Sequence, residues 1–444
     1  MNMSLHKFSR RKFIERSSLG FVGTALATTA RAIKPLSGQA DDKQEPHIRE
    51  FRTLGRTGFS VSDISCGAPS NEAVLKVLLD SGVNFIDTGE QYGNGNNEIM
   101  IGKVIKDYER KNLFIMDMIY TETNYGTREE VLERVRKAIE RLGTDYIDCL
   151  AIHGAENSRI IKDEAFHAAA LQLKQEGRIK YVGVSCHGNN WLLSPEENLE
   201  KVLMAAVDDG RFDVFLLAYN FVNSDMAEKV MDACDKKGIG TAIMKSNPVQ
   251  LYMMLSDRIK QAEEAGEKPN EYTLGFYEKY KAMTVQGRDF FKGYGAVTDE
   301  ELMSAATRFV LSNPEAHTVC CTFNNFTDVK TILGFSGQRL TTPDKALLEN
   351  YRNAFGHLTC RIGCNACEAS CPYHLPVSTI MRYNYYYEVK RREREAMEKY
   401  AKLPGEKPHI LCQNCPGYCE QNCPYGVSTR ALLAAAHLNL SWPG

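Results

Sequence analysis

Short apolar runs alternate along this chain with longer segments in which apolar residues recur at helical spacing. The segment Arg128–Leu142 shows this spacing, with Val131, Val135 and Ile139 on one face of the predicted helix. Eight other runs have the length and composition of buried strands: Ile64–Cys66, Asn84–Asp87, Leu113–Met116, Asp148–His153, Tyr181–Ser185, Val214–Leu217, Gly240–Met244 and Thr318–Cys321. Eight strands, each followed by a helix, predict an α/β fold built as a (β/α)8 TIM barrel.

The pattern divides the 444 residues into several parts. Residues 33–47 are polar and read as a linker, and residues 48–339 hold the predicted barrel. An insertion at 247–297, rich in Tyr, Met and Lys, separates the seventh strand from its helix and could cover the barrel mouth. Residues 340–444 form a second, cysteine-rich domain, and the chain is long enough for both.

Composition excludes few functions. The hydrophobic content of 43% and the charged content of 25% are those of a soluble globular protein. A net charge of −2, without a basic stripe interleaved with aromatic residues, argues against a nucleic-acid partner. Nothing in the composition indicates an oligomeric state.

The N-terminus carries a targeting pattern in residues 1–32. Ser9-Arg10-Arg11-Lys12-Phe13-Ile14 precedes a weakly apolar stretch and the small-residue site Ala30-Arg31-Ala32. This segment resembles a twin-arginine signal peptide. The resemblance implies the twin-arginine export machinery as a partner and a periplasmic or otherwise extracytoplasmic location. The alternative is a chance pair of arginines in a disordered tail.

Eight cysteines form two short runs in the tail, and each run ends in Cys-Pro. They are Cys360, Cys364, Cys367 and Cys371, then Cys412, Cys415, Cys419 and Cys423. The runs resemble those of bacterial ferredoxins, which implies a small, mainly helical domain holding two 4Fe-4S clusters. In two-cluster ferredoxins the cysteine before proline ligates the other cluster, an exchange we expect for Cys371 and Cys423. Two zinc sites or four disulfides are the alternatives.

A tyrosine-rich, strongly charged segment, Ile380–Leu403, lies between the two cysteine runs and predicts one helix. It could be a docking face for an acidic redox partner. A solvated spacer helix is the interpretation that its charge pattern favours.

Three motifs in the barrel region resemble the aldo-keto reductase family. They are Asn84-Phe85-Ile86-Asp87-Thr88 with Tyr92-Gly93, Leu142-Gly143-Thr144-Asp145-Tyr146-Ile147-Asp148 leading to His153, and Gly177-Arg178-Ile179-Lys180-Tyr181-Val182-Gly183-Val184-Ser185. The resemblance implies that Tyr92 donates a proton to a carbonyl oxygen and that His153 orients this carbonyl. It also implies that Asp87 pairs with a lysine at the end of the third strand.

That lysine is absent, and Met118 stands at its position. Lys245 is a possible electrostatic substitute. Among the positions that hold the nicotinamide cofactor in the family, Ser185 is kept, but Cys186, Met244, Lys245, Thr322 and Asn324 differ from the usual pattern. These changes argue against ordinary NAD(P)H-dependent reduction.

We therefore expect an exported iron–sulfur oxidoreductase that acts on a small, carbonyl-type substrate. Two 4Fe-4S clusters would pass electrons between a redox partner protein and the barrel. One alternative is a non-catalytic electron-transfer protein with a degenerate barrel. The other is an NAD(P)H-dependent aldo/keto reductase that is loaded with cofactor before export.

Overall fold

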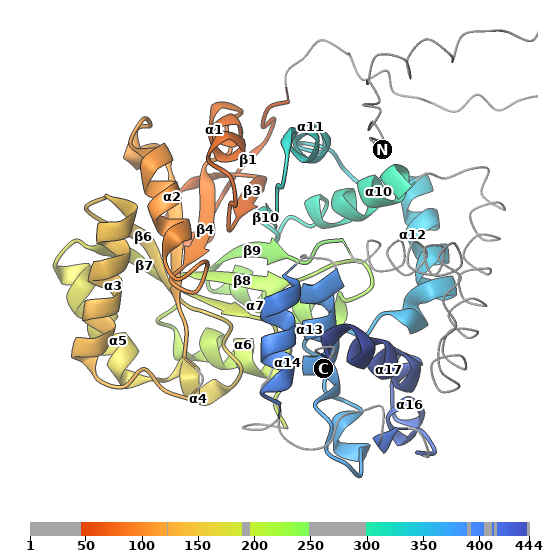
Figure 1. Ribbon diagram of the computed structural model, residues 1–444. Helices are drawn as coiled ribbons and strands as arrows, with labels where there is room; N and C mark the ends of the chain where they lie inside the picture. The colour runs from red at the N-terminus through yellow and green to blue at the C-terminus, as the bar shows by residue number, and fades with distance from the viewer. Residues whose placement is uncertain are drawn as a thin grey trace, which may run out of the picture. The chain divides into compact units, whose positions relative to one another are not determined.

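The structure, a computed structural model, describes residues 46–121, 123–188, 196–247, 299–388, 392–403, 411–412 and 415–441 (Figure 1). The predicted signal peptide, nearly all of the linker and nearly all of the insertion lie outside these residues. The described residues belong to one compact unit.

The eight predicted strands close into a barrel, which confirms the predicted (β/α)8 part of the fold. All neighbouring strands are parallel, in the order β10-β3-β4-β5-β6-β7-β8-β9. Their bounds are β3 Ile64–Gly67, β4 Phe85–Gly89, β5 Phe114–Ile119, β6 Ile147–Ile152, β7 Ile179–Cys186, β8 Val214–Ala218, β9 Gly240–Met244 and β10 Thr318–Cys321. Side chains alternate along each strand, so Phe85 faces the barrel interior and Ile86 faces the outer helices.

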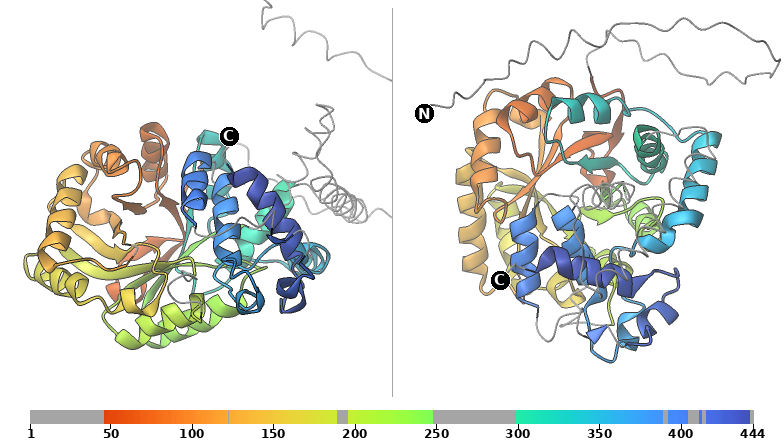
Figure 2. Two further views of the ribbon diagram at one scale, coloured as in Figure 1. Left: turned by 60° about the horizontal axis from the view of Figure 1, so that its bottom comes forward. Right: turned by 45° about the vertical axis from the view of Figure 1, so that its right-hand side comes forward.

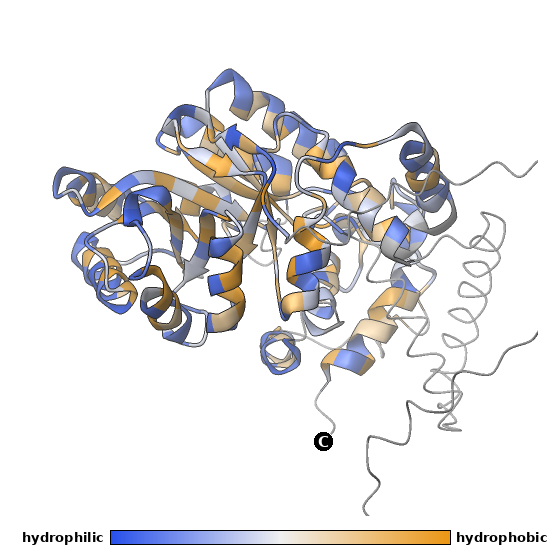
Figure 3. Cartoon of the chain, turned by 90° about the horizontal axis from the view of Figure 1, so that it is seen from above, coloured by the Kyte–Doolittle hydropathy of each residue, from blue (hydrophilic) through white to orange (hydrophobic). Residues whose placement is uncertain are grey.

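Helices surround the strands on the outside (Figures 1 and 2). They are α1 Glu72–Asp80, α2 Asn96–Ile105, α3 Arg128–Leu142, α4 Ser158–Ile161, α5 Glu164–Gln175, α6 Leu199–Asp209, α7 Asp225–Lys236, α10 Asp299–Leu311 and α11 Phe326–Leu333. Helix α3 has the bounds that its apolar spacing predicts, and Thr127 and Glu130 form a capping box at its start. Hydrophilic and hydrophobic residues alternate around these helices in Figure 3, as expected for helices with one buried face.

A hairpin of β1 Phe51–Thr53 and β2 Ser60–Ser62 closes the amino-terminal end of the barrel. Leu54 and Val61 are fully buried and pack with Phe85 and Phe114 in the barrel interior. With this end closed, only the carboxyl ends of the strands remain accessible to a ligand.

The tail after the barrel is helical in the part that the structure describes. Its helices are α12 Thr342–Phe355, α13 Val377–Glu388, α14 Glu393–Ala401, α16 Tyr418–Gln421 and α17 Thr429–Leu440. Short 3-10 turns lie at Gly55–Thr57, Arg110–Asn112, Gly356–Leu358 and Glu368–Ser370. Among the described residues, no helix combines the length and the apolar character needed to cross a membrane.

The prediction of one helix over Ile380–Leu403 is wrong. Two helices, α13 and α14, replace it and pack against each other. Ala396 and Tyr400 of α14 share a buried cluster with Tyr386 and Tyr387 of α13, which a single straight helix could not form. The segment is therefore a packed helical pair and not a solvated spacer.

Candidate functional site

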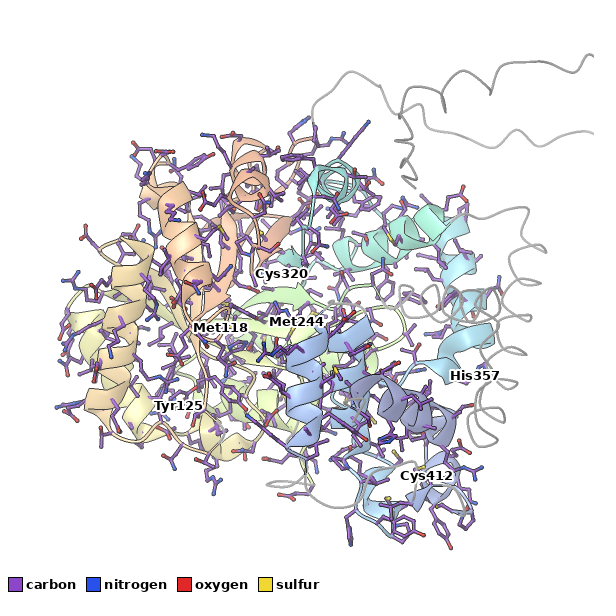
Figure 4. All side chains as sticks on the ribbon, viewed as in Figure 1. Met118, Tyr125, Met244, Cys320, His357 and Cys412 are labelled. Carbon is purple, nitrogen blue, oxygen red and sulfur yellow. The ribbon has the colours of Figure 1, made fainter. Side chains whose placement is uncertain are left out.

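A cavity of about 510 Å³ lies at the carboxyl ends of the barrel strands. The barrel contributes Asp87, Tyr92, Met118, His153 and Ser185 to its wall. The helical pair α13–α14 contributes the opposite wall, which consists of Arg382, Tyr383, Tyr386, Arg392, Glu395, Lys399, Lys402 and Leu403. Figure 4 shows Met118, Met244 and Cys320 gathered near the centre of the barrel, whereas Cys412 lies in the tail. The tail thus covers the barrel mouth.

Tyr92 and His153 face each other in this cavity, as the motifs imply. The Tyr92 hydroxyl lies 3.4 Å from Nε2 of His153. Burial lowers the pKa of His153 to about 3, and the charges of Lys399 and Arg392 add to this shift. The imidazole is therefore neutral at physiological pH and can donate or accept one hydrogen bond at Nε2.

A cation from the tail lies beside Tyr92. The guanidinium carbon of Arg392 lies 4.8 Å from the centroid of the Tyr92 ring. Burial and the negative charge of Asp87 raise the pKa of Tyr92, whereas the charge and hydrogen bond of Arg392 lower it. The phenol therefore stays protonated at physiological pH. Arg392 partly offsets the increase in its pKa that burial and Asp87 cause.

Asp87 is buried, and its partners differ from the family's lysine. Its carboxylate accepts hydrogen bonds from the backbone N–H of Ala68, at 2.8 Å, and from the thiol of Cys320, at 3.1 Å. Met118, at the lysine position, contributes an apolar side chain to the cavity wall.

Lys245 lines the same cavity but makes other contacts. Its Nζ lies 2.8 Å from Nδ1 of His187 and within 5.5 Å of the ring centroids of Tyr385 and Tyr386. Its backbone has the left-handed φ of 55°, which is uncommon for residues other than glycine. This conformation directs the chain past the end of β9 while the side chain stays buried.

The profile of the Aldo/keto reductase family matches residues 58–350. The chain belongs to this family. A voltage-gated potassium channel subunit beta of Schizosaccharomyces pombe is 32% identical over 161 residues, which cover 32% of this chain and 46% of that protein. The aldo-keto reductase YhdN of Bacillus subtilis is 22% identical over 298 residues, 60% of this chain and 82% of that protein.

The fold of the aldo/keto reductase family also appears among solved structures. The holo form of an aldo-keto reductase from Bacillus halodurans superposes with a TM-score of 0.50 at 20% identity, covering 68% of this chain and 96% of that one. At this identity the similarity concerns the fold. The chain spans about half the length of the first curated relatives it matches.

Only some of the residues at the family's cofactor-binding positions line the cavity. Ser185, Met244 and Thr322 line the cavity. Cys186 is buried outside it, with its sulfur accepting a hydrogen bond from the Gly188 N–H. Asn324 does not line the cavity, because its side chain binds Asp328 at the start of α11.

A second gap, of about 50 Å³, separates the ends of β8 and β9 from α13. Asn220, Lys245 and Asn247 line it from the barrel, and Cys360 and Tyr385 line it from the tail. Residues of the tail thus pack close to Lys245 on this side, while its side chain also lines the larger cavity.

The cysteines of the two runs lie near one another in the tail and form two overlapping groups. Burial raises the pKa of the Cys360 thiol, and the thiols of Cys364, Cys367 and Cys423 raise it further. Cys423 thus lies with the first run, although it ends the second. All eight cysteines are described, and none forms a disulfide.

The second group has the complementary membership. Burial raises the pKa of the Cys412 thiol to about 12, with further contributions from the thiols of Cys419, Cys371 and Cys415. Cys371 ends the first run but lies near thiols of the second, and Cys419 of the second run also raises the pKa of Cys367 in the first. Backbone N–H groups reach one sulfur in each group: Gly417 donates to Cys415 and Val427 donates to Cys423.

Sequence reasoning missed the tail's part in the cavity. The available signal was the density of tyrosine and basic residues in Ile380–Leu403. A solvent-exposed helix rarely contains so many aromatic residues. In the structure, Tyr383 and Tyr386 line the cavity, and Tyr386 also lies beside Lys245. His187 and Glu156, which follow β7 and β6, were missed as well, since no motif includes them.

Proposed function

We propose that this protein is an exported iron–sulfur oxidoreductase of the aldo/keto reductase family that acts on a small, carbonyl-type substrate. One observation carries the proposal. The domain with the two cysteine groups also supplies a wall of the cavity that contains Tyr92 and His153. An electron-transfer domain that lines the substrate cavity is positioned to exchange electrons with what the cavity binds.

The two thiol groups fit two 4Fe-4S clusters. The first would be held by Cys360, Cys364, Cys367 and Cys423, and the second by Cys371, Cys412, Cys415 and Cys419. No three His, Cys, Asp or Glu side chains among the described residues lie close enough to bind one metal ion. Two 4Fe-4S clusters, when bound, would supply electrons one at a time.

The residues of the barrel would manage the proton and the substrate. Reduction of a carbonyl to an alcohol takes two electrons and two protons. Tyr92 remains protonated and lies in the cavity, so it can give one proton to the carbonyl oxygen. Neutral His153 can donate a hydrogen bond to the same oxygen. The second proton comes from solvent, and a reduced partner protein provides the electrons.

The tail would take the place of a soluble hydride donor. The family's nicotinamide position is at Met244 and Lys245, which line the cavity of about 510 Å³. Tyr385 and Tyr386 of the tail lie beside Lys245, and Tyr386 lines the same cavity. Side chains of the tail thus occupy part of the space next to this position.

The proposed export by the twin-arginine route is consistent with this cofactor. That route carries folded proteins, and clusters are assembled in the cytoplasm. An exported reductase has little access to the cytoplasmic nicotinamide pool, so a protein-borne electron supply suits an extracytoplasmic location.

The test begins with protein purified under anaerobic conditions. We expect about eight irons and eight sulfides per chain, and bleaching of the visible absorption by dithionite but not by NADH or NADPH. Fewer than about three irons would exclude two clusters, and bleaching by NADPH would restore the nicotinamide-dependent alternative.

Turnover then separates an enzyme from a pure electron carrier. With reduced methyl viologen as donor, Tyr92→Phe should lower the rate of carbonyl reduction by at least about 100-fold. Tyr373→Phe, at an exposed position, is the matched control and should leave the rate unchanged. Equal rates in the two variants would favour the non-catalytic electron-transfer protein.

A further inference from the structure

The cavity at the barrel mouth is lined by more cations than carboxylates. The cations are Lys245, Arg382, Arg392, Lys399 and Lys402, and the carboxylates are Asp87, Glu156 and Glu395. Four of the five cations come from the tail, so the surplus of positive charge lies mainly on the wall that faces Tyr92 and His153.

Ion pairs neutralise only part of this charge. Arg382 binds Glu156 at 2.8 Å. Glu395 is shared by two cations, Arg392 at 3.9 Å and Lys399 at 3.4 Å. Lys402 has no ion pair among the described residues. The tail wall therefore keeps positive charge that no described carboxylate matches.

Arg382 adds an unused hydrogen-bond donor to this charge. Its side chain is only 7% exposed, and its Nε has no hydrogen-bond partner within the described part of the chain. This Nε is itself buried, but the Arg382 side chain lines the cavity, so a ligand there would meet the guanidinium through its other atoms.

Two histidines report the same positive potential. After burial, the charges of Lys399 and Arg392 lower the pKa of His153. The charges of Lys245 and Arg382 likewise lower the pKa of His187. Both imidazoles are therefore neutral and add no positive charge of their own to the cavity.

We propose that the substrate carries a carboxylate, which Arg382, Lys399 and Lys402 bind while its carbonyl group faces Tyr92 and His153. This inference rests on the proposed function, whose substrate class it narrows to small oxo-carboxylic acids. Arginine binds planar carboxylates in a directed way, and lysines add charge at long reach. The same charges draw anions toward the cavity and exclude cationic compounds.

Binding measured without an electron donor tests this directly. Isothermal titration calorimetry of the full chain, purified under anaerobic conditions, would compare 2-oxobutanoate and 4-oxopentanoate with their methyl esters. We expect each acid to bind at least tenfold more tightly than its ester. The preference should shrink when the ionic strength rises, because salt screens the charges.

Variants of opposite sign sharpen the test. The double variant Lys399→Gln/Lys402→Gln should weaken binding of the acids about tenfold and leave the esters unaffected. Glu395→Gln removes a carboxylate from the same wall and should tighten binding of the acids about threefold. Lys111→Gln, at a side chain that is 77% exposed outside the cavity, is the control and should change neither.

The inference is overturned if none of the acids binds, if acid and ester bind alike, or if the lysine variants weaken both equally. Because no turnover is measured, these outcomes are independent of the Tyr92→Phe test. A preference for the acid with unchanged turnover in Tyr92→Phe would refute the enzymatic function but keep the carboxylate site.

Discussion

The phenol of Tyr92 lies against a guanidinium from the tail of the chain. In the family, a lysine on the third strand provides the cation near this tyrosine, and here that position holds Met118. Arg392 reaches the ring from the start of α14, at 4.8 Å from its centroid. A positive charge is therefore present near the tyrosine in this protein too, but it comes from a helix of the tail and not from a barrel strand.

Removing this charge should slow proton transfer. In Arg392→Gln, burial and Asp87 act on Tyr92 unopposed, so the pKa of the phenol rises further and its proton is released less readily. We expect the viologen-driven rate to fall about 10- to 100-fold and Arg392→Lys to recover part of it. Arg394→Gln, whose side chain is 85% exposed, is the control. An unchanged rate in Arg392→Gln would show that Tyr92 does not depend on this cation.

Asp117 is a buried acid between the barrel and its helices, next to the carboxylate of Glu98. It is buried on β5, and neither of its oxygens has a hydrogen-bond partner among the described residues. Burial and the nearby Glu98 carboxylate raise its pKa in the folded protein. The folded state thus binds a proton more strongly than the unfolded state, so stability falls as pH rises from about 4 through the raised pKa.

Asp117→Asn should remove this dependence. At pH 8 we expect the variant to be more stable than the parent by about 1–3 kcal/mol, because an uncharged amide costs less to bury. Thermal denaturation at pH 5 and pH 8 measures the effect, and the loss of stability between these values should be smaller in the variant. Asp145→Asn, at an exposed position, should leave the pH dependence as it is. Parallel pH profiles for Asp117→Asn and the parent would contradict this account.

At the scale of elements, the loop after β7 and the loop of the first cysteine run meet through two glycines. A Cβ added to Gly188 would lie 2.3 Å from Cα of Gly363, and both residues have positive φ. Gly363 directly precedes Cys364, and its carbonyl accepts a hydrogen bond from the N–H of Leu199 at the start of α6. The barrel thereby fixes the position of the first thiol group.

Gly188→Ala should therefore damage one metal centre and spare the other. Displacement of the loop that bears Cys364 should reduce the iron content from about eight to about four per chain. Gly210→Ala is a matched control, since Gly210 also has positive φ but nothing lies within 4 Å of its added Cβ. Full iron content in Gly188→Ala would contradict the proposed ligand role of Cys364.

The elements that the sequence predicted well are those with local signals. The spacing in Arg128–Leu142 and the strand ends at Asp87 and His153 follow from short-range patterns, and parallel strands then bring Tyr92 and His153 within 3.4 Å. The α13–α14 pair has no such signal, because its tyrosines point to more than one partner: Tyr386 to the cavity and Tyr385 to Lys245. When a helix contacts several partners that are distant in the sequence, its aromatic residues lie on more than one face, so their spacing does not reveal which face is buried.

At the scale of the whole molecule, barrel and tail share a core. Phe221 after β8 and Leu302 of α10 pack in one buried cluster with Tyr351 of α12 and Val427 and Ala431 of the tail. The cysteine-bearing part is thus built into the barrel's surface, so the proposed export would require a route that carries folded proteins.

Export should depend on the twin arginines. In a bacterial host with a twin-arginine pathway, Arg10→Lys/Arg11→Lys should retain the protein in the cytoplasm with its iron content unchanged, as cell fractionation and metal analysis would show. Arg31→Lys, outside the arginine pair, should be exported like the parent. Equal periplasmic amounts of the double variant and the parent would exclude this route.

The proposed exchange of Cys371 and Cys423 between the thiol groups would impose an order in time. The first group is incomplete until Cys423 has been synthesised, roughly 3 to 13 seconds after Cys360 at 5–20 residues per second. Throughout that interval the ribosome presents three thiols of a site whose fourth member does not yet exist. Insertion of the proposed first cluster would therefore have to wait for Cys423, long after the N-terminal segment has emerged.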